Sequence, residues 1–413
     1  MLDAGCVVIS ATNGKTTTAR MLRGCVERPG RAIVANHAGA NLIGGVTTAL
    51  LDASRSTSPP RLGVFEVDEA ALDGVADAIQ PDVVVLMNLF RDQLDRYGEL
   101  ESLAARWAEM VLALPLDTTV VANVDDPAIA GVVDGRTGVI TFGVQDTSMA
   151  RETLAHAADS TTCRRCGAAL IYEAVLLAHQ GHWHCDSCGW SRPVPDVAVG
   201  HIAPDGLAGT DIVVDTPSGP ITTRVGLPGI HNVYNAAAAV AAALALAEEP
   251  TTIAAGIGRT DAAFGRAERV ELDGRQLVLL LAKNPAGANE NVRTVLLDVD
   301  PLHLLIALND RTADGQDVSW IWDVDYEDLF GRLESLTLTG DRAYDLALRF
   351  RYAGLSADRM HVVPDHRHAL DDAVTRAPAR GTVYALPTYT AMLELREELG
   401  RRGVTRAFWK EGA

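Results

Sequence analysis

Residues 7–18 read Val7-Val8-Ile9-Ser10-Ala11-Thr12-Asn13-Gly14-Lys15-Thr16-Thr17-Thr18. This stretch begins as a β-branched run, breaks into a turn of small residues and ends in Gly-Lys-Thr. The order predicts a strand, a phosphate-binding loop and a helix, because the N–H groups of such a loop and of the helix N-terminus point toward an anion. We therefore expect Thr12 to Thr17 to bind the phosphates of a nucleoside triphosphate.

Two side chains of this loop have specific expected roles. Lys15 supplies a compact positive charge for phosphate, and the Thr16 hydroxyl is a ligand for Mg²⁺. The usual phosphate-loop pattern would need a glycine where this chain has Ile9, so the loop is shorter and its first small residue is Ala11. Gly-Lys-Thr alone also occurs by chance on helices, but the preceding strand favours the nucleotide-binding interpretation.

Composition limits the possible partners and compartment. The chain has 413 residues, which is enough for two or three domains, and a formal net charge of −18. Since nucleic-acid binding depends on clustered Lys and Arg and no such cluster occurs, we expect no nucleic-acid partner. The longest apolar run, 236–247, is too short to cross a bilayer and predicts a buried helix. The first residues do not resemble a signal peptide. These features favour a cytoplasmic protein with at most peripheral contact at the inner face of the membrane.

Two Cys-x-x-Cys pairs, separated by 18 residues, predict a metal site: Cys163, Cys166, Cys185 and Cys188. Each pair can present two thiolates to one tetrahedral ion, so the two pairs form a closed four-sulfur zinc site with a structural role. Disulfides are the alternative, and a reducing cytosol disfavours them. Two nearby histidines, His182 and His184, are expected to be bystanders.

The rest of the first half alternates strand-like and helix-like segments, as in a doubly wound α/β sheet. Runs at 62–67, 82–87 and 118–122 are β-rich. Because ligands of such sheets lie at the carboxyl ends of the strands, we expect Glu66 to hold Mg²⁺ opposite the phosphate loop. Asp68 and Glu69 are weaker candidates, since an acidic strand end is often simply solvated.

Six segments occur in an order that resembles the central ATPase domain of the Mur ligase superfamily. They are Ala11 to Thr16, Glu66, Asn88 to Arg96, Ala122 to Pro127, Gly229 to Ala236 and Phe264 to Arg266. The resemblance implies that Lys15 and Thr16 hold phosphate and Mg²⁺ and that Glu66 is a metal ligand. It further implies that Asn232 and Asn235 lie near the adenine and that Arg266 approaches the terminal phosphate.

The departures from the superfamily pattern are equally informative. Where amino-acid-adding Mur ligases have Asp-His, this chain has Asp92-Gln93, and the following helix at 100–114 contains no lysine that could be carbamylated. Their Asp-x-x-His-Asn-Pro signature is replaced by residues 281–287, Leu-Ala-Lys-Asn-Pro-Ala-Gly. The nucleotide chemistry of the superfamily is therefore expected here, without its handling of an incoming amino acid.

The four-cysteine insert, residues 282–287 and the acidic and aromatic run at 309–323 together resemble the MurT family. Its members are ligase subunits that amidate the D-glutamate of peptidoglycan lipid II. The resemblance implies a GatD-type glutaminase partner and an aspartate that completes the partner's catalytic triad, here Asp317. We expect an ATP-binding domain at 1–268, the zinc-ribbon insert at 155–195 within it, and a smaller C-terminal α/β domain at 269–413.

The chemistry expected of such a ligase is activation of a carboxylate by ATP to an acyl phosphate, which ammonia then converts to an amide. The chain shows no glutaminase nucleophile of its own, because Cys6 and Cys25 do not lie on a strand-to-helix elbow. Ammonia must then come from a partner. Two alternatives stay open: a ligase that adds a whole amino acid, and a nucleotide-gated scaffold whose zinc ribbon recruits a partner.

The C-terminal part predicts a second α/β domain, with β-rich runs at 335–339, 361–364 and 382–386 and a helix at 342–352. Before them, Asp314-Gly315 favours a turn followed by a β-rich stretch. In such a stretch Trp320 and Trp322, two residues apart, would share one face. The turn alone would also account for Asp317 without any catalytic role.

Overall fold

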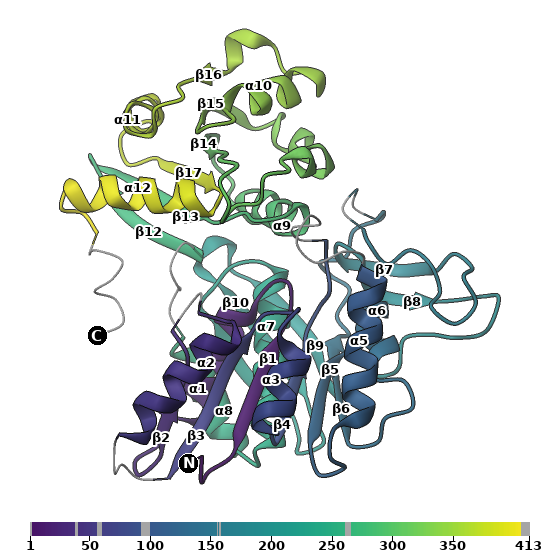
Figure 1. Cartoon of the computed structure of the whole chain (residues 1–413). Coiled ribbons are helices and arrows are strands. Elements are labelled where there is room, and N and C mark those ends of the chain that lie inside the picture. Colours follow the sequence, from purple (N-terminus) through teal and green to yellow (C-terminus); the bar gives the residue numbers. More distant parts are fainter. Residues whose placement is uncertain are drawn as a thin grey trace. The chain divides into compact units, whose positions relative to one another are not determined.

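The structure is a computed structural model. It describes residues 2–37, 40–55, 60–91, 100–154, 156, 158–260 and 266–405, and of Arg266 only the backbone. The chain divides into two compact units, Met1–Asp261 and Ala262–Ala413. Each unit is built on its own sheet (Figure 1).

The first unit contains a nine-stranded sheet in the order β11-β10-β9-β6-β5-β4-β1-β3-β2. From β2 to β9 neighbouring strands are parallel, and β10 and β11 continue the sheet antiparallel. The strands are β1 (Cys6–Ser10), β2 (Ala32–Val34), β3 (Arg61–Val67), β4 (Val83–Leu86), β5 (Thr119–Asn123), β6 (Val139–Val144), β9 (Val197–Pro204), β10 (Thr210–Asp215) and β11 (Ile221–Val225). Since β1 lies between β3 and β4, the carboxyl end of β1 lies at the point where the strand order reverses, which is the usual ligand site of such sheets.

Helices cover both faces of this sheet. On one face α2 (Ile43–Ser54), α3 (Leu72–Ile79), α5 (Leu100–Ala113) and α6 (Pro127–Val132) share an apolar core with strands β1 to β5. The other helices of this unit are α1 (Lys15–Val26), α7 (Ile230–Ala245) and α8 (Pro250–Gly258). Helix α7 packs on α1 and on the central strands, and its residues 236–243 are completely buried. The predicted buried helix is thus confirmed for residues 236–243, and α7 ends at Ala245, before the end of the apolar run.

The four-cysteine insert takes the place of a crossover helix. Strands β6 and β9 pair in parallel, and a parallel pair needs a crossover connection. Here that connection contains the antiparallel hairpin β7 (Ile171–Leu177) and β8 (Gln180–His184). The insert is thus a structural part of the sheet's topology rather than an appendage.

The second unit has a six-stranded sheet in the order β12-β13-β17-β14-β15-β16. Its strands are β12 (Arg266–Leu272), β13 (Arg275–Leu280), β14 (Leu302–Ala307), β15 (Leu333–Thr339), β16 (His361–Val362) and β17 (Thr382–Pro387). Its helices are α9 (Pro285–Val295), α10 (Ala343–Tyr352), α11 (His366–Arg376) and α12 (Tyr389–Arg401), and short 3₁₀ turns lie at Ser319–Asp323, Tyr326–Leu329 and Ala357–Arg359. All strand pairs are parallel except β12 with β13. The predicted α/β fold class is confirmed in both units.

One local prediction is wrong. The stretch after Asp314-Gly315 is a 3₁₀ turn at Ser319–Asp323 and not a β-rich strand. The cause is the buried guanidinium of Arg349, which donates to the backbone carbonyls of Ile321 at 3.2 Å and Val324 at 2.7 Å and so holds the chain in a tight turn. Trp322 is 47% exposed and lies beside Tyr352, with ring centroids 5.8 Å apart. Because successive residues of a 3₁₀ turn are about 120° apart, Trp320 and Trp322 do not share a face.

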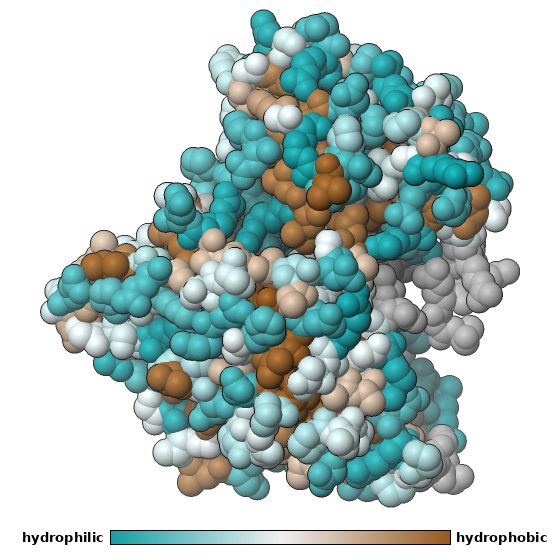
Figure 2. All heavy atoms as spheres, turned by 180° about the vertical axis from the view of Figure 1, so that it is seen from behind, coloured by the Kyte–Doolittle hydropathy of each residue, from teal (hydrophilic) through white to brown (hydrophobic). Residues whose placement is uncertain are grey.

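Among the described residues, no helix is both long and apolar enough to span a bilayer. Hydrophilic residues cover much of the face shown in Figure 2, and hydrophobic residues gather in smaller patches between them.

Candidate functional site

The loop predicted to bind phosphate connects β1 to α1, so the predicted order of strand, loop and helix is confirmed; we keep the name phosphate loop for it. It turns at Gly14, whose φ of +95° is a left-handed conformation that glycine adopts without strain, and no side chain caps α1. A Cβ at Gly14 would lie only 2.2 Å from Oδ1 of Asn235 on α7. The loop therefore requires glycine at this position both for its conformation and for close contact with α7.

Lys15 is buried and lies beside a carboxylate. Its Nζ is 2.6 Å from Oε2 of Glu69 and also donates to the carbonyl of Ala11. Glu69 lies just beyond the carboxyl end of β3 and is itself buried. The Glu69 carboxylate therefore pairs with the positive charge of Lys15, as a bound phosphate group would.

Thr16 and Glu66 converge. The Thr16 hydroxyl donates to Oε2 of Glu66 at 2.7 Å, which brings two oxygen ligands of the kind preferred by Mg²⁺ to one point. The Asn36 amide holds the backbone of Glu66 on both sides, since Oδ1 accepts from its N–H at 3.0 Å and Nδ2 donates to its carbonyl at 2.8 Å. Glu66 is therefore fixed at the carboxyl end of β3.

The segment after β4 binds to the phosphate loop. The Asn88 amide exchanges two hydrogen bonds with the backbone of Asn13, each 2.9 Å long. The Phe90 N–H donates to the Thr12 hydroxyl at 3.0 Å. Residues 88–91, which we call the strand-end loop, thus fix the start of the phosphate loop.

Asn232 and Asn235 are buried on the first turns of α7, and their side chains are joined by a hydrogen bond of 3.1 Å. Asn235 also lies within 3.3 Å of the Thr18 hydroxyl on α1, so it connects α7 with the helix of the phosphate loop. Thr17 is buried on α1. Arg266 begins β12, and its side chain lies outside the described residues, as do Asp92 and Gln93.

The four predicted cysteines come together. Their sulfurs lie within 4.8 Å of one another, and two of the distances are 3.6 Å (Cys163 to Cys188) and 3.5 Å (Cys166 to Cys185). A tetrahedral zinc ion with Zn–S bonds of about 2.3 Å needs sulfurs about 3.8 Å apart, so the cluster fits zinc. The two nearby histidines make other contacts: His182 with the Val144 carbonyl and His184 with Asp186.

Asp125 and Asp126 anchor the insert to the sheet. Asp125 accepts from the Tyr234 hydroxyl at 2.6 Å and pairs with Arg192 of the insert. Asp126 caps α6 by accepting from the Ala128 N–H at 2.8 Å, and its other oxygen accepts from the N–H of Leu89 at 3.0 Å. The Asp-Asp-Pro segment therefore connects the insert, α7 and the strand-end loop.

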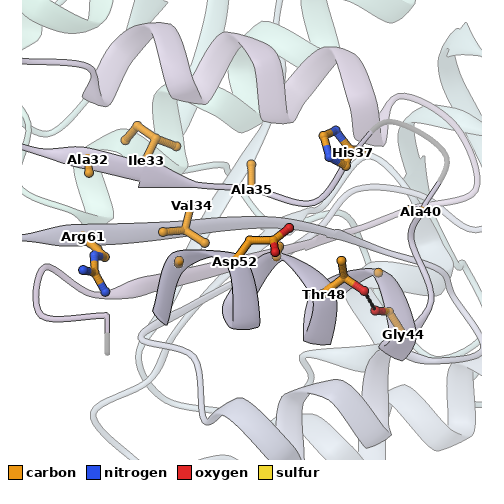
Figure 3. A pocket seen from close by; sticks show the side chains of 13 residues that line it. Ala32, Ile33, Val34, Ala35, His37, Ala40, Gly44, Thr48, Asp52 and Arg61 are labelled. Atoms are coloured by element: carbon orange, nitrogen blue, oxygen red, sulfur yellow. Dashed lines mark hydrogen bonds between the residues drawn. The ribbon is translucent and has the colours of Figure 1, made fainter. Parts of the chain in front are cut away.

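A pocket of about 430 Å³ lies between β2 and α2 (Figure 3). Small and aliphatic residues form most of its lining, and His37, Asp52 and Arg61 are the titratable ones. Ala40, which also lines it, accepts a 2.8 Å hydrogen bond from the Asn36 amide that holds Glu66. One wall of this pocket is thus connected to the predicted metal ligand.

In the second unit Asp317 is exposed on the loop after β14. Its carboxylate accepts from the Ser319 N–H at 2.8 Å, and these hydrogen bonds with Ser319 lower the pKa of Asp317. The loop is anchored by Asp314, which accepts from the Thr390 N–H at 2.7 Å, and by Asn309, which donates to the Thr388 hydroxyl at 3.0 Å. An ionised carboxylate on a fixed loop is thus accessible to another molecule.

The two cysteines outside the cluster are buried in the first unit. Burial raises the pKa of Cys6 and of Cys25 to about 12, so both are neutral thiols at physiological pH. Because the thiolate is the nucleophilic form, neither residue is suited to glutamine hydrolysis.

Sequence reasoning missed two side chains, Asn36 and His179, which lies 3.3 Å from Asp126. They carry no local signal, since each contacts residues distant in the chain. Glu69 was considered as a magnesium ligand, whereas the structure places it on Lys15. A search for buried polar residues at strand ends would have found Asn88, which lies in a segment already singled out.

Comparison with known proteins agrees with this arrangement. The family model of the Mur ligase middle domain matches residues 9–174, and that of the MurT ligase C-terminal domain matches residues 281–392. The chain is 33% identical to the lipid II isoglutaminyl synthase (glutamine-hydrolyzing) subunit MurT of Streptococcus pneumoniae, over 97% of this chain and 88% of that protein. The protein of the same name from Staphylococcus aureus is 29% identical over 96% of this chain and 87% of its own length.

Solved structures show the same fold. A pseudomurein peptide ligase type C from Methanothermus fervidus has a TM-score of 0.74 and 20% identity, covering 97% of this chain and 79% of that one. MurF ligase from Thermotoga maritima in complex with ADP has a TM-score of 0.68 and 14% identity, covering 96% and 81%. With a relative above 30% identity along nearly its whole length and both domain models matched, the chain belongs to the MurT family of Mur ligases.

Proposed function

We propose that this chain amidates the α-carboxylate of D-glutamate in peptidoglycan lipid II, with ATP and with ammonia from a GatD-type glutaminase. The observation that carries the proposal is the relationship to lipid II isoglutaminyl synthase subunits, combined with the phosphate loop and its paired Thr16 and Glu66. Because this substrate is anchored in the membrane, the chain associates peripherally with the cytoplasmic face of the membrane.

In this proposal the phosphate loop, Thr12 to Thr17, holds the phosphates of ATP, and Lys15 exchanges its contact with Glu69 for the phosphate oxygens. The oxygens of Thr16 and Glu66 would hold Mg²⁺, which would supply positive charge beside the phosphates. Asn232 and Asn235 lie toward the adenine, and Arg266 toward the terminal phosphate. The four cysteines hold zinc, and its role is structural because all four ligand positions are filled by protein.

The chemistry follows from the poor reactivity of a carboxylate. Its oxygen attacks the γ-phosphorus, the bond from that phosphorus to the β–γ bridging oxygen breaks, and ADP leaves. Ammonia then attacks the carbon of the acyl phosphate, phosphate leaves with the electron pair of the C–O bond, and the nitrogen loses a proton. The product is D-isoglutamine.

Ammonia comes from the partner because this chain offers no suitable thiolate. Asp317 is the group that this chain contributes to glutamine hydrolysis: ionised and exposed, it orients and charge-stabilises the partner's catalytic histidine. The role is that of an orienting carboxylate, so its loss should affect the glutamine route alone.

The test is amidation of lipid II with ammonium salts or glutamine, with and without a GatD-type glutaminase. We expect activity with ammonium in both cases and with glutamine only when the partner is present. Lys15→Ala should abolish both routes. Asp317→Asn should lower the glutamine route about 10⁴-fold, by analogy with loss of a triad aspartate, and spare the ammonium route.

Asp358→Asn, which removes another exposed carboxylate of the same unit, is the matched control and should change neither route. ATP consumption only when a free amino acid is supplied would overturn the proposal in favour of an amino-acid-adding ligase. Nucleotide binding without any ligation would favour the scaffold alternative.

A further inference from the structure

The turn between β7 and β8 is buried, although hairpin turns normally lie at the surface. His179 is completely inaccessible to solvent and Ala178 is 5% exposed. Ala178 has a φ of +49°, a left-handed conformation that is unfavourable for a residue with a Cβ. Contacts around the turn must therefore outweigh this cost, and His179 makes them.

The imidazole of His179 has neighbours on both ring nitrogens and on its face. Nδ1 accepts a hydrogen bond from the Asp159 N–H at 3.2 Å, and Nε2 lies 3.3 Å from Oδ2 of Asp126. With Nδ1 as an acceptor, Nε2 is the ring nitrogen that carries the proton; it lies beside the carboxylate without making a well-aligned hydrogen bond. The ring also packs on Phe90, with centroids 4.8 Å apart.

These neighbours lead directly to the phosphate loop. The Asp126 oxygen beside His179 also accepts from the N–H of Leu89, and Phe90 donates from its N–H to the Thr12 hydroxyl. The Arg91 N–H donates to the Asp159 carboxylate at 2.9 Å. Three successive residues of the strand-end loop are thus held by His179 or by the two aspartates that contact it.

At its other end the hairpin is braced by the metal site. Cys185 follows β8 directly, and the β8 residue Trp183 packs on Trp190 with ring centroids 4.5 Å apart. Cys163, Cys185 and both tryptophans share one small apolar core. A metal ion that ties the four cysteines together therefore stiffens the hairpin that carries His179.

We propose that His179 is a positioning residue that links the zinc-binding insert to the nucleotide site by holding the strand-end loop against the phosphate loop. Zinc in the four-cysteine site then strengthens binding of Mg-nucleotide, and nucleotide must raise the affinity for zinc by the same factor, because coupling between two binding equilibria is reciprocal. This inference rests on the proposed nucleotide site, but on neither the amidation step nor the partner subunit.

The test measures the dissociation constant of MgADP by calorimetry and the zinc content by elemental analysis on the full chain. We expect His179→Ala to stay folded, retain its zinc and bind MgADP about tenfold more weakly, within the usual range of such couplings. His179→Gln, which keeps a donor near the Nε2 position, should restore part of the affinity. His201→Ala, which removes an exposed histidine of β9, is the matched control and should bind as the wild type does.

A second measurement covers the case in which His179→Ala fails to fold. In the wild type, saturating MgADP should raise the affinity for zinc, measured by equilibrium competition with a chelator, by about tenfold. Equal zinc affinity with and without MgADP would overturn the inference, as would a folded, zinc-loaded His179→Ala with wild-type affinity for MgADP. Absence of MgADP binding to the wild type would instead remove the proposed nucleotide site, and the inference with it.

Discussion

Asp126 shows how one buried carboxylate can organise a site. It caps α6, accepts from the strand-end loop and faces His179, and it is completely inaccessible to solvent. Burial raises the pKa of this carboxyl group, but the contacts with His179 and with the N–H groups of Leu89 and Ala128 outweigh burial, so its pKa is lower than usual. Asp126 is therefore ionised at neutral pH and stabilises the fold in that form.

We predict that Asp126→Asn lowers the free energy of unfolding by about 2–4 kcal/mol at pH 7, since it removes a buried charge that is hydrogen-bonded and paired. The folded-state pKa lies below the unfolded value of about 3.9. The stabilisation is thus fully present above that pH and is lost as the pH falls through the folded pKa. Urea unfolding of both proteins between pH 7 and pH 3 measures the difference, which should narrow below about pH 4. Equal stability at pH 7 would contradict this assignment.

The predictability of the site differs from residue to residue. Thr12 to Thr17 and the four cysteines could be singled out because each set forms a short local motif, and the structure brings the four cysteines together. Phosphate and metal binding stay predictions. Glu69 and His179 could not be assigned their contacts, because Lys15 is 54 residues from Glu69 and Asp126 is 53 residues from His179 along the chain. Contacts between buried polar groups depend on how strands and helices pack. No local pattern in a single sequence shows which distant residues this packing brings together.

Two helices of the first unit approach each other at glycines. A Cβ on Gly24 of α1 would lie 2.8 Å from the carbonyl oxygen of Gly256 on α8, and a Cβ on Gly256 would lie 2.5 Å from the backbone of Cys25. Real Cβ atoms do not approach backbone so closely, so any side chain at either glycine must push the helices apart. Close helix packing here depends on the absence of side chains.

We therefore predict that Gly256→Ala lowers the free energy of unfolding by about 1–3 kcal/mol, the usual cost of an overpacked contact. Gly258→Ala in the same helix is the matched control, because its Cβ would have nothing closer than 3.8 Å. Alanine's higher helix propensity applies to both variants. The difference between their free energies of unfolding therefore reports the steric clash at Gly256. Denaturant titration of the two variants gives this difference, and equal stabilities would show that α8 moves without cost.

Helices and strands were predicted best where the local propensity of the residues agrees with the packing around them. The β-branched runs at 62–67 and 118–122 became β3 and β5, whose ends differ from the predicted ones by one residue. The strand prediction for residues 319–323 was wrong. Their aromatic and β-branched side chains favour a strand, but Arg349 donates to the Ile321 carbonyl and the stretch forms a 3₁₀ turn. The buried guanidinium of Arg349 needs hydrogen-bond acceptors, and this need overrides the local propensity for a strand. The sequence alone does not show the contact, because it depends on where α10 packs.

At the scale of the whole molecule, the net charge of −18 disfavours binding of polyanions such as nucleic acids. Ion pairs between arginines and carboxylates do not change this balance, because pairing neither adds nor removes charge; the excess of acidic groups decides it. We predict no binding of single-stranded oligonucleotides stronger than about 10⁻⁴ M at physiological salt, the weak end of non-specific affinity. Fluorescence anisotropy with a labelled oligonucleotide measures it. Tighter binding that weakens steeply with salt would contradict this prediction and point to a basic surface that the net charge conceals.

The place of the cysteine insert between β6 and β9 has a consequence for how the protein is made. As the chain leaves the ribosome, β6 emerges before its neighbour β9 and is an open strand edge until the intervening segment has closed. Open edges pair readily with other chains and promote aggregation. We therefore expect zinc shortage during synthesis to keep this edge open for longer and to increase the fraction of newly made protein that aggregates.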